Sequence, residues 1–553
     1  MTAVAVDRGL AEPGRGWLLA CLYPALVALV ALFLAYPIVE LLARAVFADD
    51  RLSFAPLARV LGEPYNRQAI YNTLVLGLTV AVLGTILATL YAYAMTRVEM
   101  PGKRVWHFLA LLPTISPPIL MALSLILLYG RRGLVTHELL GLQTTILYGY
   151  WGLVAAQTLS YFPFAYLLLL NLFRGLDASL EEAAGTMGAH PGKVLTTVSL
   201  PLLVPGLAGA CVLLFGYSFA DLGNPLLLGG DFPVLSSQIY LAIIGQYDIP
   251  RGAALAVILL VPAALLFFFQ KHLAARTAHA SVGGRGSVRH PQVRHPGARV
   301  AALIVCGGVS LVILMQYATV LAGATTRLFG INNELTLRHF TAALTNSRNA
   351  LVDTIALGVA ASIVSAVVGV LIAYFVARTR AFGRGALDFT ANLPLAIPGT
   401  VIGLGFALAF NHRPLLLTGT AFIIVIAFSM RALPYAIRSG IATLQQLHPS
   451  LDEASTNLGA TREQTLWRVL LPLVRPAIIA GMIFTFTRSV TTLSAVIFVV
   501  SPHWSLVTPT ILSQMDRGDL GEAAALSVIL VVLVLAVIHG VPRFIGRDWR
   551  EQA

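Results

Sequence analysis

The feature that most constrains the fold of this chain is a series of apolar runs, each long enough to cross a lipid bilayer. A helix rises 1.5 Å per residue, so about 20 apolar residues span the roughly 30 Å hydrocarbon core. About twelve runs are predicted, centred near Ala28, Leu83, Leu120, Leu159, Leu213, Leu260, Ser310, Ser365, Gly403, Val425, Ile483 and Val532. Prolines and glycines interrupt the runs near Leu120 and Gly403. The expected fold class is an all-α membrane protein.

Composition agrees with a bilayer environment. The chain is 57% hydrophobic and only 11% charged, so it has too little polar surface to cover a water-soluble globule of 553 residues. The first apolar run, from about Trp17 to Ile38, is longer than the core of a signal peptide. We therefore expect it to be a retained first span.

The distribution of basic residues predicts the topology. An even number of spans places both termini on one side. The segments expected on that side hold roughly twice as many lysines and arginines as the opposite side. Both termini are therefore predicted to be cytoplasmic. The net charge of +12 reflects this bias and predicts no nucleic-acid partner, which would need a basic face on a soluble module.

A basic segment divides the chain into two nearly equal parts. Residues 273–298 hold glycines, prolines and scattered arginines without helical or strand periodicity. Its three histidines suggest metal binding as an alternative, but their spacing is irregular and the arginines would repel a cation; they are His279, His290 and His295. We predict a cytoplasmic linker between a first repeat, residues 1–272, and a second, residues 299–553.

The two parts are internal repeats. Matching residues lie 281 positions apart early in each repeat, as in Pro113 with Pro394 and Pro117 with Pro398. From Pro163 and Pro434 onward the separation is 271, so the second repeat lacks ten residues, most simply in the external loop at residues 131–143. Six spans per repeat give two parallel repeats about a pseudo-two-fold axis along the membrane normal.

One loop carries the same pattern in both repeats, between the fourth and fifth spans. The first copy contains Glu182, Ala183, Ala184 and Gly188, and the second contains Glu453, Ala454, Ser455 and Gly459. In both, a proline follows nineteen residues after the glutamate, at Pro201 and Pro472. The pattern predicts a short helix, a glycine turn, and a second short helix ended by the proline. Ser179 with Glu182, and Ser450 with Glu453, also fit a capping box.

This pattern resembles the EAA loop of ABC importer permeases, with the small residue Ser455 in place of the second alanine. The resemblance implies a type I importer permease fold, located in a bacterial inner membrane. It also implies that each loop docks in a groove of a cytoplasmic ATPase, so that two ATPase copies bind. The stretch from Gly188 to Val194 has the wrong spacing for a phosphate-binding loop. We therefore expect a non-enzymatic permease without its own cofactor, with ATP and Mg bound by the partner ATPase subunits.

Two further segments resemble the ferric-iron permease family, a relative of the phosphonate, thiamine and sulfate permeases. They are residues 220–230, which read ADLGNPLLLGG, and residues 488–498, which read RSVTTLSAVIF. The resemblance implies import of ferric iron delivered by a periplasmic or extracytoplasmic binding protein. A phosphonate or phosphate ester, such as 2-aminoethylphosphonate or a sugar phosphate, and thiamine are the alternative substrates.

Arg488 is the main candidate for chemistry inside the membrane. A cation within a span is costly and tends to face a cavity or a partner. Arg488 either lines the pathway and attracts an anion, or it snorkels or pairs with a carbonyl.

Asp221 is a candidate partner or gate residue, and the alternative is a solvated interfacial carboxylate. Asn224 is a further pathway candidate. Pro117, Pro118 and Pro398 either break helices beside the pathway or kink them for packing, and Gly399 with Gly403 suggests close helix packing.

A different class of protein fits the span count as well. An ion-gradient-driven secondary transporter also has about twelve spans and parallel repeats. It needs no matched docking loops, however, and its ion coupling usually requires acidic residues within spans, which are scarce here.

The three cysteines, Cys21, Cys211 and Cys306, lie in apolar runs without ligand-like spacing. We therefore predict no disulfide framework and no metal site.

Overall fold

The computed structural model describes residues 17–48, 51–142, 144–278 and 292–545. The regular secondary structure of these residues is helical apart from two short antiparallel hairpins. Eleven helices in the described residues are long and apolar enough to cross a membrane, or twelve if the helix pair 384–395 and 399–409, bent by 110°, counts as one span. The all-α prediction and the span count are confirmed.

The first repeat contains all its expected spans, several extended by π-helical or 3-10 turns. Its elements are α1 (Trp17–Val30), η1 (Ala31–Ala35), α2 (Tyr36–Val46), β1 (Phe47–Ala48), β2 (Arg51–Leu52), α3 (Ala55–Gly62), α4 (Pro64–Arg97), α5 (Lys103–Leu111), η2 (Leu112–Thr114), α6 (Ile119–Tyr129), η3 (Leu134–Leu139), α7 (Tyr150–Gly175), α8 (Ala178–Thr186), α9 (Pro191–Val194), η4 (Leu195–Ser199), α10 (Leu200–Phe219), α11 (Gly223–Leu228), α12 (Leu235–Tyr240), η5 (Leu241–Gly245) and α13 (Ile249–Ala278).

The second repeat follows the same order with a shorter connection after its third span. Its elements are α14 (Pro296–Thr325), β3 (Thr326–Leu328), β4 (Asn332–Leu335), α15 (Arg338–Asn346), α16 (Arg348–Arg378), α17 (Arg384–Asn392), η6 (Leu393–Leu395), α18 (Gly399–Ala409), α19 (Ala421–Gln446), α20 (Ser450–Asn457), α21 (Arg462–Thr465), η7 (Leu466–Leu470), α22 (Leu471–Thr491), α23 (Val507–Asp516) and α24 (Leu520–Ile545). The turn η3 lies between α6 and α7, where the sequence predicts the extra residues, and has no counterpart between α18 and α19.

The linker is shorter than the sequence predicts. Helix α13 continues to Ala278 and α14 begins at Pro296, so both ends of the expected 273–298 segment are helical. His295 is the N-cap of α14 and accepts a hydrogen bond from the Gly297 amide at 3.1 Å. The other two linker histidines, His279 and His290, lie outside the described residues.

The first span of each repeat packs against the opposite repeat. Helices α1 and α2 contact α16, α17 and α18, while α14 contacts α4, α5 and α6. The Tyr23 hydroxyl in α1 donates to the Phe382 carbonyl at 2.6 Å, and the Tyr317 hydroxyl in α14 donates to the Leu112 carbonyl at 2.9 Å. This exchange joins the repeats into one body with continuous buried apolar clusters.

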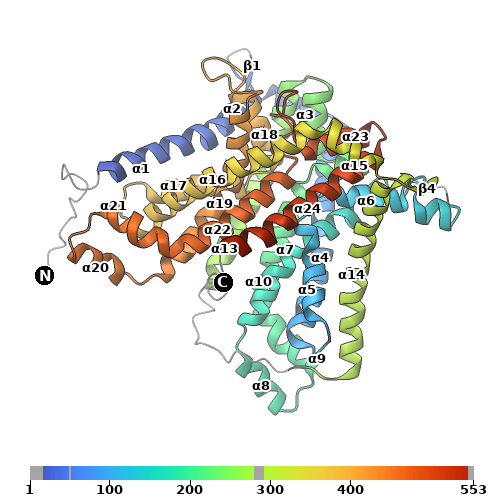
Figure 1. Ribbon diagram of the computed structural model, residues 1–553, viewed down its shortest axis with the longest axis horizontal. Coiled ribbons are helices and arrows are strands. Elements are labelled where there is room, and N and C mark those ends of the chain that lie inside the picture. The colour runs from blue at the N-terminus through green and yellow to red at the C-terminus, as the bar shows by residue number, and fades with distance from the viewer. Residues whose placement is uncertain (1–16, 49–50, 143, 279–291, 546–553) are drawn as a thin grey trace.

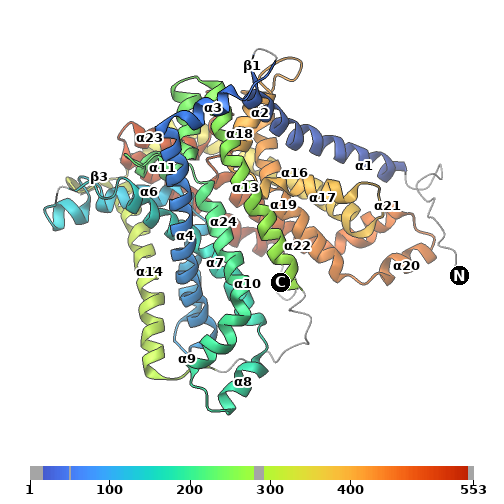
Figure 2. The same ribbon diagram turned by 180° about the vertical axis from the view of Figure 1, so that it is seen from behind.

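The two predicted docking loops lie far apart. In Figure 1, α8 and α9 form one corner of the molecule and α20 and α21 another. The view from behind in Figure 2 shows the same separation, with α3, α18 and α23 gathered on the side opposite to both loops. The two repeats are therefore spread apart on the side of the docking loops and lie together on the opposite side.

Candidate functional site

Each docking loop is a helix–turn–helix unit built around one glycine. Gly188 has φ +84° and Gly459 has φ +81°, the left-handed region that glycine adopts without steric cost. A Cβ at either position would meet no atom within 4 Å. Backbone conformation, not packing, therefore requires glycine here, and the predicted glycine turn is confirmed in both repeats.

The predicted capping boxes are wrong. Asp177 is the N-cap of α8 and accepts a hydrogen bond from the Ser179 amide at 2.9 Å, so Ser179 lies inside the helix. Helix α20 starts at Ser450 after Pro449 and has no side-chain cap. The N-cap positions are held by Asp177, two residues before Ser179, and by Pro449, directly before Ser450, and not by the serines. The capping box of the second loop lies instead at Thr461 and Gln464, at the start of α21.

The prolines do not end the second docking helices. Helix α9 continues through the π-helical turn η4 into α10, and α21 continues through η7 into α22, each as one unbroken span. Pro201 and Pro472 lie in the first turn after these wide turns. A proline lacks an amide donor and clashes with a normal α-turn, and a π-helical turn can accommodate that defect within a continuous helix.

The motif residues divide into exposed and buried sets. Glu182, Ala183, Glu453 and Ala454 face outward, whereas Ala184 and Ser455 are buried against the rest of their loops. The Ser455 hydroxyl lies 2.7 Å from the Thr465 hydroxyl, which joins α20 to α21. The small second position is thus needed for packing within the loop, and the glutamates remain accessible to a partner.

An apolar side chain projects from the tip of each loop. Met187 is 84% exposed and Leu458 is 88% exposed, and they occupy the same position in the two repeats, just before the turn glycine. Their matched positions at the two loop tips make them candidates for contact with a partner surface. The sequence motif does not include either residue.

Each docking helix is tied to the end of a long span by an ion pair that the sequence analysis missed. Arg97, at the end of α4, donates through Nε to Glu181 Oε2 at 2.8 Å, and both side chains are 4% exposed. In the second repeat Arg378 Nη1 donates to Asp452 Oδ2 at 2.8 Å, with 11% and 36% exposure. The two arginines are related by the repeat offset of 281 residues, and the two acidic residues by the offset of 271 residues. This matched placement of an arginine and an acidic residue in both repeats was the signal available in the sequence.

The backbone contacts of the two arginines are also shared. Arg97 Nη2 donates to the Phe173 carbonyl at 2.8 Å, and Arg378 Nη2 donates to the Leu444 carbonyl at 2.6 Å. These carbonyls lie at equivalent positions, near the ends of α7 and α19. Each arginine therefore joins the end of the second span of its repeat, the end of the fourth span and the docking helix at a single point.

A separate cavity of about 70 Å³ lies between the repeats, and residues from both line it. Arg431 of α19 and Arg488 of α22 contribute from the second repeat, and Tyr161, Tyr217 and Asp221 from the first. The cavity wall also includes Pro117 and Pro118, which precede α6. Of the two alternatives for these prolines and Pro398, the structure has the helix break, since α6 begins at Ile119 and α18 at Gly399.

Arg488 is stacked on aromatic rings of the opposite repeat. Its guanidinium carbon lies 5.4 Å from the ring centroid of Phe164 and 5.8 Å from that of Tyr217. Those two rings stack on each other at 4.6 Å. Among the residues that the structure describes, Arg488 has no hydrogen-bond acceptor and no ion-pair partner. The alternative in which it pairs with a carbonyl is therefore wrong for this conformation.

Arg431, which the sequence analysis did not select, also faces the cavity. Its Nη1 donates to the Ile397 carbonyl at 3.1 Å, in the break between η6 and α18, and to the Pro394 carbonyl, in η6. Carbonyls freed at a helix break need donors. Arg431 thus stabilises the broken span while placing a second positive charge on the cavity wall.

Asp221 is buried and held by amides. It is 6% exposed, which excludes the solvated alternative, and its Oδ2 accepts hydrogen bonds from Gln157 at 2.9 Å and Asn224 at 2.7 Å. It forms no ion pair with Arg488 or Arg431 in the described part of the chain. Asn224 lies behind Asp221 rather than on the cavity wall, and acts on the cavity through it.

The G-x-x-x-G pattern in α18 packs against the segment that follows α22. A Cβ on Gly403 would lie 2.7 Å from the Ala495 carbonyl oxygen, and one on Gly399 would collide with the Ser494 hydroxyl. On the first repeat, a Cβ on Gly223 would touch Leu493 and Ile119. These close approaches join the segments after α10 and α22 over the cavity.

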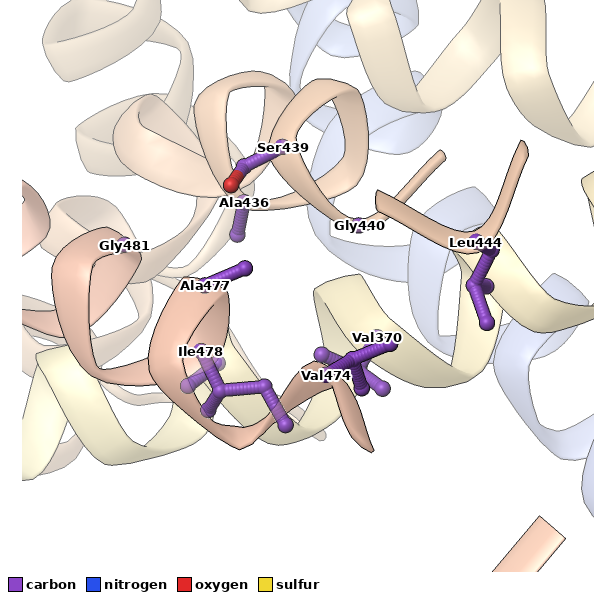
Figure 3. Close-up of a pocket in the computed structure, with 10 residues that line it drawn as sticks. Val370, Ala436, Ser439, Gly440, Leu444, Val474, Ala477, Ile478 and Gly481 are labelled. Carbon is purple, nitrogen blue, oxygen red and sulfur yellow. The ribbon is translucent and has the colours of Figure 1, made fainter. Parts of the chain in front are cut away.

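A second hollow, shown in Figure 3, has different chemistry. It lies among α16, α19 and α22 and is lined by small and apolar side chains, including Val370, Ala436, Val474 and Ile478. Ser439 contributes its only hydroxyl group, and none of the lining residues is charged. Of these two hollows, only the cavity between the repeats has charged side chains in its wall.

Comparison with known proteins identifies the family. Residues 81–279 and 365–550, well over half of the chain, match the model of the binding-protein-dependent transport system inner membrane component family. The chain belongs to this family. It is therefore the membrane permease subunit of an ABC importer, which works with an ATPase and a substrate-binding protein.

Individual relatives of the permease cover most of its length. The ferric transport system permease protein FbpB of Actinobacillus pleuropneumoniae is 32% identical over 93% of this chain and 76% of its own. A putative FbpB of Haemophilus influenzae is 32% identical over 86% of this chain and 77% of its own. The putative 2-aminoethylphosphonate permease PhnV of Salmonella paratyphi A is 26% identical over 46% of this chain and 97% of its own. The permease thus contains two copies of a unit that PhnV nearly matches in length.

Proposed function

We propose that this permease forms the complete translocation pathway of an ATP-driven ferric iron importer. The observation that carries this proposal is the pair of matched docking loops, each with an accessible glutamate, an exposed apolar tip and an ion pair to a long span. Ferric iron is the cargo named for the FbpB relatives, which span most of the chain.

One ATPase copy binds at each loop. Glu182 and Glu453 face the ATPases with Ala183 and Ala454, while Ala184, Ser455, Gly188 and Gly459 set the shape of the loops. ATP and Mg²⁺ are bound by those subunits, on the cytoplasmic side with both termini of the permease. The extracytoplasmic binding protein delivers cargo to the opposite side, and lipid covers the exposed apolar side chains of the spans.

The separation of the loops gives a mechanism. The repeats diverge toward the loops and converge on the other side, as Figures 1 and 2 show. ATP-driven closure of the two ATPases draws the loops together. The ion pairs of Arg97 and Arg378 transmit this movement to α4 and α16, and the repeats open on the opposite side. The cavity with Arg488, Asp221 and the supporting Asn224 is the transit site between them.

A reconstitution experiment tests this function. The permease, its ATPase and its binding protein are placed in liposomes, and uptake of radioactive ferric iron is measured with ATP, with a non-hydrolysable analogue, and with a proton or sodium gradient alone. We expect uptake only with hydrolysable ATP. Uptake driven by a gradient without the ATPase would indicate a secondary transporter. ATP-driven uptake of 2-aminoethylphosphonate but not of iron would show that the substrate is the phosphonate instead of ferric iron.

A further inference from the structure

We propose that the cavity between the repeats binds an oxyanion, with Arg488 as the principal ligand. The cargo of the permease therefore crosses the membrane as an anion or as a ferric ion coordinated by anions. This inference rests on the proposed transport function and adds the chemical class of the species in transit.

The stacking of Arg488 orients its donors. Phe164 and Tyr217 lie against the guanidinium, as the ring distances of 5.4 and 5.8 Å show. Contact with ring faces stabilises the charge but uses none of the five N–H donors, which lie in the guanidinium plane. Since no described residue accepts from them, the donors remain available on the cavity side. A planar fork of free donors matches two oxygens of an oxyanion.

The repeat symmetry shows that this arginine is not a packing requirement. Arg488 and Tyr217 lie 271 residues apart and hold equivalent positions in α22 and α10. The equivalent residues Phe164 and Tyr435 each contact a ring in the adjacent span of their own repeat. An aromatic residue therefore fits this position, and the second repeat has a cation there instead.

A second positive charge strengthens the preference for anions. Arg431 lines the same cavity, so two guanidinium groups face one small space. Like charges in a site of low dielectric constant repel, and an anion between them removes this cost. Tyr161 also lines the wall, where its hydroxyl forms a hydrogen bond with Asp221. Asp221 contributes one negative charge, but its Oδ2 is already engaged by Gln157 and Asn224.

The same groups disfavour a bare ferric ion. In the part of the chain that the structure describes, no group of three or more His, Cys, Asp or Glu side chains could hold a metal ion. Only one carboxylate lines the cavity, opposite two arginines. A trivalent cation would be repelled unless anionic ligands accompany it, and those ligands are the groups that Arg488 would bind.

Binding of sulfate and phosphate to the full-length permease in nanodiscs, without the ATPase, tests the proposal. Dissociation constants are measured by calorimetry against sodium chloride at matched ionic strength. We expect saturable binding of at least one oxyanion, weakened roughly tenfold or more by Arg488→Gln because charge-assisted hydrogen bonds are lost. Arg438→Gln is the matched control, because Arg438 is exposed on α19 away from the cavity and should leave binding unchanged.

A second variant keeps the test decisive if Arg488→Gln does not fold. Asp221→Asn removes the negative charge of the cavity while retaining its size, so it should tighten oxyanion binding. The proposal is overturned if the unmodified permease shows no saturable oxyanion binding. It is also overturned if the Arg488→Gln or Asp221→Asn variant binds oxyanions with the same affinity as the unmodified permease.

The result is separable from the proposed function. Binding in nanodiscs requires neither ATP hydrolysis nor iron. If oxyanions bind through Arg488 but the reconstituted system imports no iron, only the ferric assignment fails. If iron is imported but Arg488→Gln binds oxyanions as the unmodified permease does, only this inference fails.

Discussion

Arg97 and Glu181 form a buried ion pair, 2.8 Å between Arg97 Nε and Glu181 Oε2, that joins the end of α4 to the first turn of docking helix α8. The Ser199 hydroxyl adds a hydrogen bond to Glu181 Oε1 at 2.8 Å. The carboxylate therefore lies among α4, α8 and the π-helical turn before α10. Movement of the docking helix must move both spans or break this pair.

Removal of one partner of this pair should be costly. Glu181→Gln leaves the Arg97 charge buried without compensation, and we expect a loss of about 3–5 kcal/mol in stability. Asp452→Asn should cost less, on the order of 1 kcal/mol, because Asp452 is 36% exposed and water replaces part of the interaction. Thermal unfolding of both variants measures the difference, and equal losses would contradict the burial argument.

The turn glycines should be needed for coupling rather than for packing. Gly188→Val with Gly459→Val forces side chains into the left-handed region, which changes the angle between the two docking helices although no neighbour clashes. We expect a folded permease whose ATPase still hydrolyses ATP but whose substrate uptake is lost. Uptake at the wild-type rate in the double variant would show that these glycines are not needed for coupling.

The apolar loop tips should anchor the ATPases. Met187→Asp and Leu458→Asp place charges where apolar contact is expected, so ATPase co-purification should fall strongly while thermal stability is kept, because both side chains are exposed. Phe382→Asp is a matched control, since Phe382 is 98% exposed outside the loops. Retention of the ATPase by the Met187 and Leu458 double variant would show that the tips are not anchors.

The contact between α18 and the segment after α22 should not tolerate a side chain. A Cβ on Gly403 approaches the Ala495 carbonyl to 2.7 Å, so Gly403→Ala should destabilise the permease by about 1–3 kcal/mol and lower uptake. Gly209→Ala is the control, because open space surrounds Gly209 in α10 and alanine favours helices. A Gly403→Ala variant as stable as Gly209→Ala would refute the close approach.

Much of the docking site could be predicted because its signals are local. The spacing from Glu182 to Pro201 recurs from Glu453 to Pro472, and a left-handed turn selects glycine whatever surrounds it. The capping boxes were predicted wrongly because Asp177 and Pro449, just upstream, determine where each helix starts. The helix ends at Pro201 and Pro472 were wrong because adjacent π-helical turns accommodate the prolines.

The sequence by itself determined the span count, the duplication and the paired docking loops, because each depends on residue type and spacing along one segment. Only the tertiary structure decided which charges meet. Arg97 reaches Glu181 across 84 residues, and Arg488 stacks on rings of the other repeat. Those contacts depend on how spans far apart in the chain pack together, and no local pattern encodes that packing.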